Sequence, residues 1–299
     1  MEVLHLTVAL DGSWLLALLS LFVLTALVSG RIPLVRWRSA DEPSVSPEWR
    51  ASDVFVTFLA YLLFTIPAAL IAEKLETSGV LSLAGRILFV QASTAVVVVC
   101  LIFAELRAKG LVSVKEQAAP ALGFRASSLS NLAPMVLLFF VTYMPLMWIH
   151  SAWVIGLRWI HEGQLSEQVP VKLFRDSVIN GDVSSLFLFT LATVVVAPMI
   201  EEILFRGVLY PALRDYFCRI ASPGKKSLGI LAAALLSSLL FAGAHGSFAV
   251  ILPLLAVGSL LCYVLQKTGS LLYAMAFHAL FNGAQLVGMY FMARGEAGS

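Results

Sequence analysis

Charged residues are scarce in this chain. Asp, Glu, Lys and Arg make up 13% of its 299 residues, whereas hydrophobic residues make up 60%. Soluble domains average about 25% charged and about 45–50% apolar residues. The composition therefore excludes an ordinary soluble domain and predicts an integral membrane protein. The net charge of +2 says nothing about nucleic acid, and no nucleotide-binding motif is visible, so we expect no nucleic-acid partner.

Cysteine is also rare, and its spacing excludes two kinds of site. Cys100, Cys218 and Cys262 are scattered in or beside apolar segments. They form no CxxC pair and no pattern typical of a disulfide framework. We expect them to be small buried hydrophobic residues.

The first residues lack Lys and Arg. The leader MEVLHLTVALDG carries Glu2 and Asp11 but no basic residue. A secretory signal peptide has a positively charged first region. The first apolar segment is therefore predicted to be a membrane helix, which is retained in the protein.

Long apolar runs are what the chain has in abundance. A run of 18 or more apolar residues is a candidate spanning helix. We predict an all-α polytopic membrane helical bundle of about eight transmembrane helices, forming a single domain over residues 1–299. The longer polar segment 158–184 could include a short interfacial helix around VKLFRDS. The predicted spans are 13–30, 54–72, 87–104, 133–156, 184–205, 227–245, 248–266 and 270–292.

The basic residues favour one orientation of this bundle. With an outside N-terminus, the loops on the inside hold 14 of the 20 basic residues, Arg206 and Arg214 among them. Cytoplasmic loops of membrane proteins are enriched in Lys and Arg. We therefore expect both the N-terminus and the C-terminus to lie outside.

Three charges interrupt the apolar run near residue 200, in the stretch APMIEEILFRG. Charges within a spanning helix are costly and usually face a protein interior or a watery cavity. On an α-helix Glu201 and Glu202 point about 100° apart, whereas Glu202 and Arg206 share a face at i, i+4 spacing. We expect Glu202 and Arg206 to form an ion pair, which leaves Glu201 available as a general base. The alternative is a cluster that only caps a helix end.

Two later segments carry polar residues at helical spacing. Phe241 and His245 are four residues apart in FAGAH, and His278 and Asn282 are four residues apart in HALFN. Each pair therefore lies on one face of its helix. Taken singly, either pair could serve only hydrogen bonding between helices.

Together these residues supply the groups that amide hydrolysis needs. A base activates water, and hydrogen-bond donors stabilise the oxyanion, each donor being worth about 3–4 kcal/mol. No GxSxG, Ser-Lys or HExxH pattern occurs in the chain. The sequence therefore favours a water-activating site over a serine nucleophile or a local zinc motif.

The three segments resemble a known family, the CPBP intramembrane proteases, also called Abi proteins, which include the type II CAAX prenyl endopeptidases. The family pattern EExxxR, FxxxH and HxxxN reads here as EEILFR (201–206), FAGAH (241–245) and HALFN (278–282), in that order. The resemblance covers roughly 184–290, which we take as the catalytic core.

The resemblance implies an intramembrane endopeptidase that cuts a membrane-associated or lipidated protein. It implies that Glu201 and His245 activate water, and that His278 and Asn282 form the oxyanion hole. Glu202 and Arg206 would hold the helix geometry, with Phe241 as a supporting residue. No cofactor or metal is expected.

Three other functions stay open at this stage. A zinc peptidase could use Glu201, His245 and His278 as ligands. A non-catalytic scaffold, or a protein of the bacteriocin-immunity type, would need no such polar set in the membrane. A proton-coupled transporter could use a Glu and His relay, but it predicts inverted repeats that the sequence does not contain.

Overall fold

The fold is all-helical, as the sequence predicts. The computed structural model describes residues 49–110, 132–160, 169–222 and 224–297, and within these ranges it contains helices and no strand. Seven of the described helices are long and apolar enough to cross a membrane. The predicted span 13–30 lies outside the described residues. The elements are α3 (Ala51–Thr77), α4 (Leu83–Ala108), α5 (Leu132–Ile160), α6 (Val169–Asn180), α7 (Val183–Thr190), η2 (Leu191–Val196), α8 (Ala197–Glu202), η3 (Ile203–Leu209), α9 (Tyr210–Ile220), α10 (Lys226–Ala244), α11 (Phe248–Thr268) and α12 (Leu271–Ala297).

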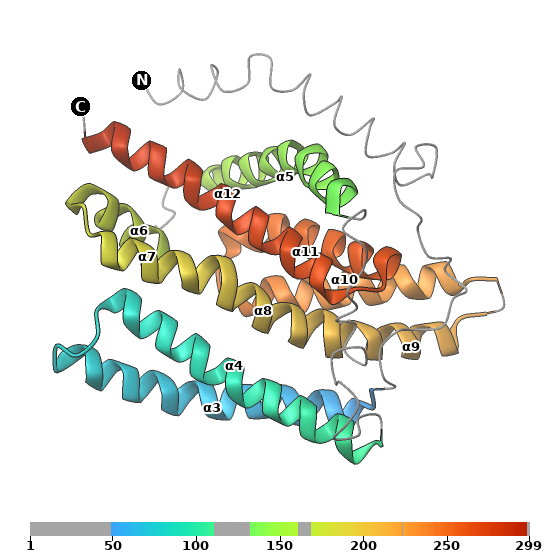
Figure 1. Ribbon diagram of the computed structural model, residues 1–299. Helices are drawn as coiled ribbons and strands as arrows, with labels where there is room; N and C mark the ends of the chain where they lie inside the picture. Colours follow the sequence, from blue (N-terminus) through green and yellow to red (C-terminus); the bar gives the residue numbers. More distant parts are fainter. Residues whose placement is uncertain (1–48, 111–131, 161–168, 223, 298–299) are drawn as a thin grey trace.

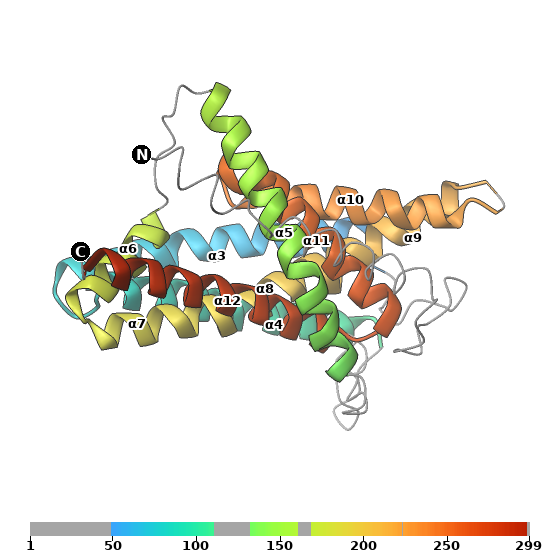
Figure 2. The ribbon, with the colours of Figure 1, turned by 90° about the horizontal axis from the view of Figure 1, so that it is seen from above.

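The helices pack around one long central helix, Val183–Ile220. The pair α3 and α4 lies on one side of it, and α10 packs both on α9, the last part of this helix, and on α11 (Figure 1). Helix α5 crosses α11 and α12 obliquely and packs on both (Figure 2). The amphipathic helix α6 confirms the expected short helix around VKLFRDS, and it packs against α12 and α7.

The central helix is longer than the sequence predicted. The predicted span ended at residue 205, but helical structure continues from Val183 to Ile220, over 38 residues. At 1.5 Å per residue this is about 55 Å, well beyond a hydrocarbon core of about 30 Å. Arg206 was counted as a loop residue, and that was wrong, because it is fully buried within the helix.

Two π-helical segments, η2 and η3, flank α8 within this helix. In η2 the N–H of Ala197 bonds to the carbonyl of Ala192, five residues back. The next bond in that register would join residue 198 to Thr193, but Pro198 has no N–H. The side-chain amide of Asn282 on α12 donates to the Thr193 carbonyl instead, at 2.9 Å.

The second π segment has a similar arrangement. Pro211 cannot supply the N–H that an α-helix would direct to the carbonyl of Gly207. The indole Nε1 of Trp49 donates to that carbonyl at 2.8 Å, in a buried contact. Side chains from distant segments therefore satisfy two carbonyl groups of the central helix, and both prolines are accommodated without ending it.

Capping residues determine where several helices begin or end. The Ser82 side chain accepts a hydrogen bond from the N–H of Gly85 at the start of α4, and Asp182 does the same for Ser185 at the start of α7. The hydrogen bonds from Ser185 hold the pKa of the Asp182 carboxyl below its usual value. Gly269 ends α11 with φ of 65°, a left-handed conformation that glycine adopts without strain.

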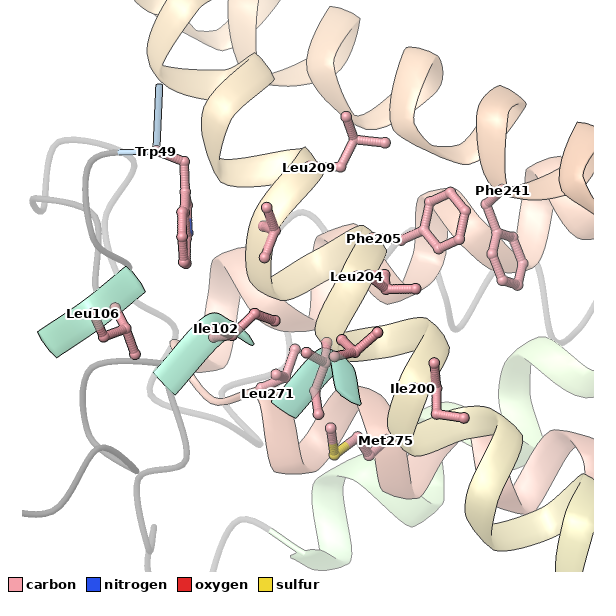
Figure 3. Close-up of a cluster of buried hydrophobic side chains, with 13 residues drawn as sticks. Trp49, Ile102, Leu106, Ile200, Leu204, Phe205, Leu209, Phe241, Leu271 and Met275 are labelled. Carbon is pink, nitrogen blue, oxygen red and sulfur yellow. The ribbon is translucent and has the colours of Figure 1, made fainter. Parts of the chain in front are cut away.

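The largest buried apolar cluster surrounds the central helix where the motifs meet. It joins Trp49, the end of α4, η3, α10 and the start of α12 (Figure 3). Phe205 on η3 packs edge to face against Phe241 on α10, with ring centroids 5.2 Å apart. This cluster fixes the position of α8, which carries the paired glutamates.

Candidate active site

The three sequence motifs come together in space. Glu201 and Glu202 lie in α8, His245 forms the C-cap of α10, and His278 and Asn282 lie on α12. Helix α12 packs against α8 and η2, and η3 packs against α10. The site is therefore assembled from three helices that are distant in sequence.

Glu202, Arg206 and His278 form a buried hydrogen-bonded chain. The Arg206 Nη1 donates to Glu202 Oε1 at 2.9 Å, and both side chains are fully buried. The same oxygen lies 2.8 Å from His278 Nδ1. The other ring nitrogen, Nε2, is 3.7 Å from Glu201 Oε2. His278 thus lies between the two glutamates, which the helix spacing alone did not reveal.

The hydrogen-bond partners of His278 determine which of its ring nitrogens carries a proton. A carboxylate that is paired with arginine only accepts hydrogen bonds, so His278 Nδ1 donates to Glu202. Nε2 can also donate if the ring carries both protons.

Arg206 is held by two further contacts. Its Nη2 donates to the carbonyl of Gly258 on α11 at 3.2 Å. Its guanidinium carbon lies 4.4 Å from the centre of the Phe241 ring, a cation–π geometry. A Cβ on Gly258 would lie 2.8 Å from Ser238 Cβ and 3.1 Å from Arg206 Nη2, so this close approach requires glycine.

Phe241 also contacts both histidines. Its ring centroid lies 4.9 Å from that of His245 and 5.8 Å from that of His278, both edge to face. The carbonyl of Phe241 lies 2.9 Å from His245 Nδ1. A carbonyl only accepts, so Nδ1 carries the proton and, in the neutral ring, Nε2 is the nitrogen that can accept one.

Glu201 and His245 lie at the junction of two cavities. The larger cavity, of about 440 Å³, has Glu201, His245, His278 and Asn282 in its wall. The smaller one, of about 210 Å³, also includes Glu201 and His245, together with Phe58 and Tyr61 from α3 and Leu204 and Phe205 from the central helix. The Glu201 side chain keeps 26% of its surface exposed, and it lines both cavities.

No metal-binding group is evident in the described ranges. Within residues 49–110, 132–160, 169–222 and 224–297, no three His, Cys, Asp or Glu side chains are placed to hold a metal ion together. His278 Nδ1, one of its two possible ligand atoms, is occupied by Glu202.

Sequence reasoning found the charged and aromatic residues but missed their partners. The Glu202–Arg206 pair has the predicted contact. Thr193, Trp49 and Gly258 were not identified, because their contribution is a carbonyl group or a long-range contact without a local pattern. Pro198 and Pro211 were the available signal, since each leaves a helical carbonyl without its usual donor.

Comparison with known proteins agrees with the resemblance found in the motifs. The model of the family described as type II CAAX prenyl endopeptidase Rce1-like matches residues 183–284, about a third of the chain. This range includes all three motifs. The match supports a protease at the level of the family, and the seven apolar helices support an integral multi-pass membrane protein. Curated proteins and solved structures gave no match.

Proposed function

We propose that this protein is an endopeptidase that hydrolyses a peptide bond of a membrane-associated or lipidated protein within the bilayer. The observation that carries the proposal is the position of Glu201 and His245 in the walls of both cavities. An endopeptidase must hold substrate on both sides of the bond that it cuts. A reactive pair at the junction of two cavities meets that requirement. The catalytic core comprises residues 184–290 of a single membrane domain.

Glu201 and His245 activate the attacking water in this proposal. His245 Nε2 accepts a hydrogen bond from the water, because Nδ1 donates to the Phe241 carbonyl. The Glu201 carboxylate, which is partly exposed and is not the partner of Arg206, removes the proton. After attack, the proton passes to the leaving amine, and the peptide bond breaks.

His278 and Asn282 stabilise the oxyanion. A ring protonated on both nitrogens donates from Nδ1 to Glu202 and from Nε2 to the developing negative charge. The Asn282 amide has two N–H groups. One donates to the Thr193 carbonyl, and the second is available to the substrate. Glu202 and Arg206 position His278 without touching the substrate.

Two alternatives make different predictions. A zinc peptidase with Glu201, His245 and His278 as ligands would lose activity on removal of zinc. A non-catalytic scaffold would bind a membrane protein without cutting it. The buried charges oppose the scaffold, because ionisable groups within a membrane span are costly and an inert protein gains nothing from them.

The test is cleavage of a library of membrane-tethered peptides, prenylated and unprenylated, by purified protein with and without a strong zinc chelator. We expect cleavage that resists the chelator and that falls at least about 10³-fold in Glu201→Gln, because the base is lost. Glu201→Gln should retain the wild-type melting temperature, since Glu201 is outside the buried ion pair.

Each other outcome points to one alternative. Loss of activity with chelator and recovery with zinc would replace the glutamate mechanism with a metal-dependent one. Full activity in Glu201→Gln would contradict the assigned base. Binding of peptides by the wild-type protein with no cleavage would favour the scaffold.

A further inference from the structure

The larger cavity contains polar side chains that the proposed chemistry does not use. Gln91 from α4, His150 from α5 and Gln285 from α12 all lie in its wall, within helices long enough to span the membrane. The rest of the wall is mostly apolar. Polar groups at this depth are costly unless they find partners, so their presence requires an explanation.

The two glutamines lack strong partners among the described residues. The Gln91 Oε1 atom is buried and accepts no hydrogen bond from the described part of the chain. Gln285 Nε2 donates to Met147 Sδ at 3.2 Å, and a thioether sulfur is a weak acceptor. An incoming group with N–H and C=O functions would satisfy both amides better than the protein itself does.

The spacing along α12 gives the distance to the candidate active site. His278, Asn282 and Gln285 follow one another at intervals of four and three residues, so they share one face of the helix. Gln285 lies about 10 Å along the helix from His278. An extended peptide covers about 10 Å in three residues.

We propose that Gln91 and Gln285 bind the main-chain N–H and C=O groups of an extended substrate segment, with Gln285 about three residues from the bond that is cut. The bilayer core has no water to satisfy peptide groups, so an unfolded segment there needs hydrogen bonds from the protein. A glutamine side chain offers both a donor and an acceptor, and therefore pairs with a peptide unit of any sequence. Both glutamines are therefore substrate-binding residues that hold the peptide in place. The location of the cut rests on the proposed function.

The first test measures binding and does not depend on hydrolysis. A membrane-tethered peptide from the library is bound to Glu201→Gln protein, and then to the same protein with Gln91→Leu or Gln285→Leu added. We expect each addition to weaken binding by roughly 3- to 10-fold, the usual effect of one neutral hydrogen bond. Met289→Leu, in the wall of the same cavity, is the matched control and should bind as the parent does.

The second test identifies the main-chain group. Peptides are made in which one amide at a time is replaced by an ester, which removes a single N–H. We expect one ester to weaken binding to the parent but not to the Gln91→Leu variant. In the active protein, both glutamine variants should raise KM and leave kcat nearly unchanged, because the lost contact is made equally before and during reaction.

Three binding results would overturn the inference. They are unaltered binding in both glutamine variants, an ester scan with no position that depends on either glutamine, and absence of any peptide binding to Glu201→Gln. A fall in kcat together with a lower melting temperature would also contradict it, since that pattern indicates a structural role. Peptide binding that depends on the glutamines, without cleavage by the wild type, would contradict the proposed function alone.

Discussion

At the scale of single residues, the glutamate pair divides into two environments. Glu202 is fully buried and contacts both Arg206 and His278, whereas Glu201 is partly exposed at the junction of the cavities. Adjacent positions on a helix point in different directions, and this produces the division. Neighbouring carboxylates can therefore serve different roles, one in structure and one in chemistry.

Glu202→Ala is expected to destabilise the protein. The change leaves the buried Arg206 guanidinium without its carboxylate and releases His278 Nδ1. Removing one partner of a buried ion pair costs about 3–5 kcal/mol. The melting temperature and the yield in detergent should fall clearly, whereas those of Glu201→Gln should not. Wild-type stability in Glu202→Ala would show that Arg206 needs no counter-charge.

At the scale of elements, the central helix is held by side chains that replace missing backbone donors. Asn282 donates to the Thr193 carbonyl, one turn before Pro198. Trp49 donates to the Gly207 carbonyl, one turn before Pro211. The π segments η2 and η3 lie at these two places. Such bulges are frequent at functional sites. Here they flank α8, the helical segment that contains Glu201 and Glu202.

Trp49→Phe should destabilise the protein, and Pro211→Ala should partly reverse the effect. Phenylalanine keeps most of the ring but cannot donate to the Gly207 carbonyl, and an unsatisfied buried group costs about 1–3 kcal/mol. Alanine at 211 supplies an N–H that points toward the carbonyls of the preceding turn, Gly207 among them. Thermal unfolding of the single and double variants measures this coupling. Additive effects in the double variant would argue against the replacement of donors.

The same logic separates the two roles of Asn282. Asn282→Ala should lower both the melting temperature and the rate of peptide cleavage, because one N–H donates to Thr193 and the other is assigned to the oxyanion. Adding Pro198→Ala restores a backbone donor for Thr193. We expect the double variant to regain stability. Its cleavage rate should stay about 10²-fold or more below that of the wild type. Recovery of the rate as well would mean that Asn282 acts only through the helix.

At the scale of the whole molecule, basic residues of the described chain are more numerous at the end of the bundle where α4 ends and α12 begins. The opposite end carries fewer of them, among them Lys74, Arg86, Lys172, Arg175 and Arg294. Lys109 at the end of α4 pairs with Asp53 near the start of α3, and the Arg214 Nη1 atom bonds to Gln266 near the end of α11. The turn between α9 and α10 lies at the same end (Figures 1 and 2). The basic residues there are Arg50, Arg107, Lys109, Arg214, Arg219, Lys225, Lys226 and Lys267.

We propose that this basic end faces the cytoplasm, in accordance with the enrichment of Lys and Arg in cytoplasmic loops. Helix α12 begins at that end and runs away from it, which places the C-terminus outside. A cysteine introduced at residue 296 of a cysteine-free variant should react with a membrane-impermeant reagent applied from outside. A cysteine at residue 225 should react only after the membrane is made permeable. The reverse pattern would contradict the orientation.

Local patterns in the sequence were sufficient for the helical class, seven of the predicted spans within the described chain, and the Glu202–Arg206 pair. Each depends on composition or on the spacing of residues along one helix. The continuation of the central helix past residue 205 was not predicted, because the donor for the Gly207 carbonyl next to Pro211 is Trp49, which is far away in sequence. A proline pattern shows that a donor is missing, but it cannot show what replaces it.

The sequence by itself determined a membrane bundle with a Glu, His, His and Asn set on three helices, since hydropathy and periodicity are local properties. Only the tertiary structure decided that His278 lies between the two glutamates, and that Glu201 and His245 border two cavities. Those facts depend on how α8, α10 and α12 pack against one another. Packing is set by contacts between residues that are distant in the chain, and no spacing along a single helix contains them.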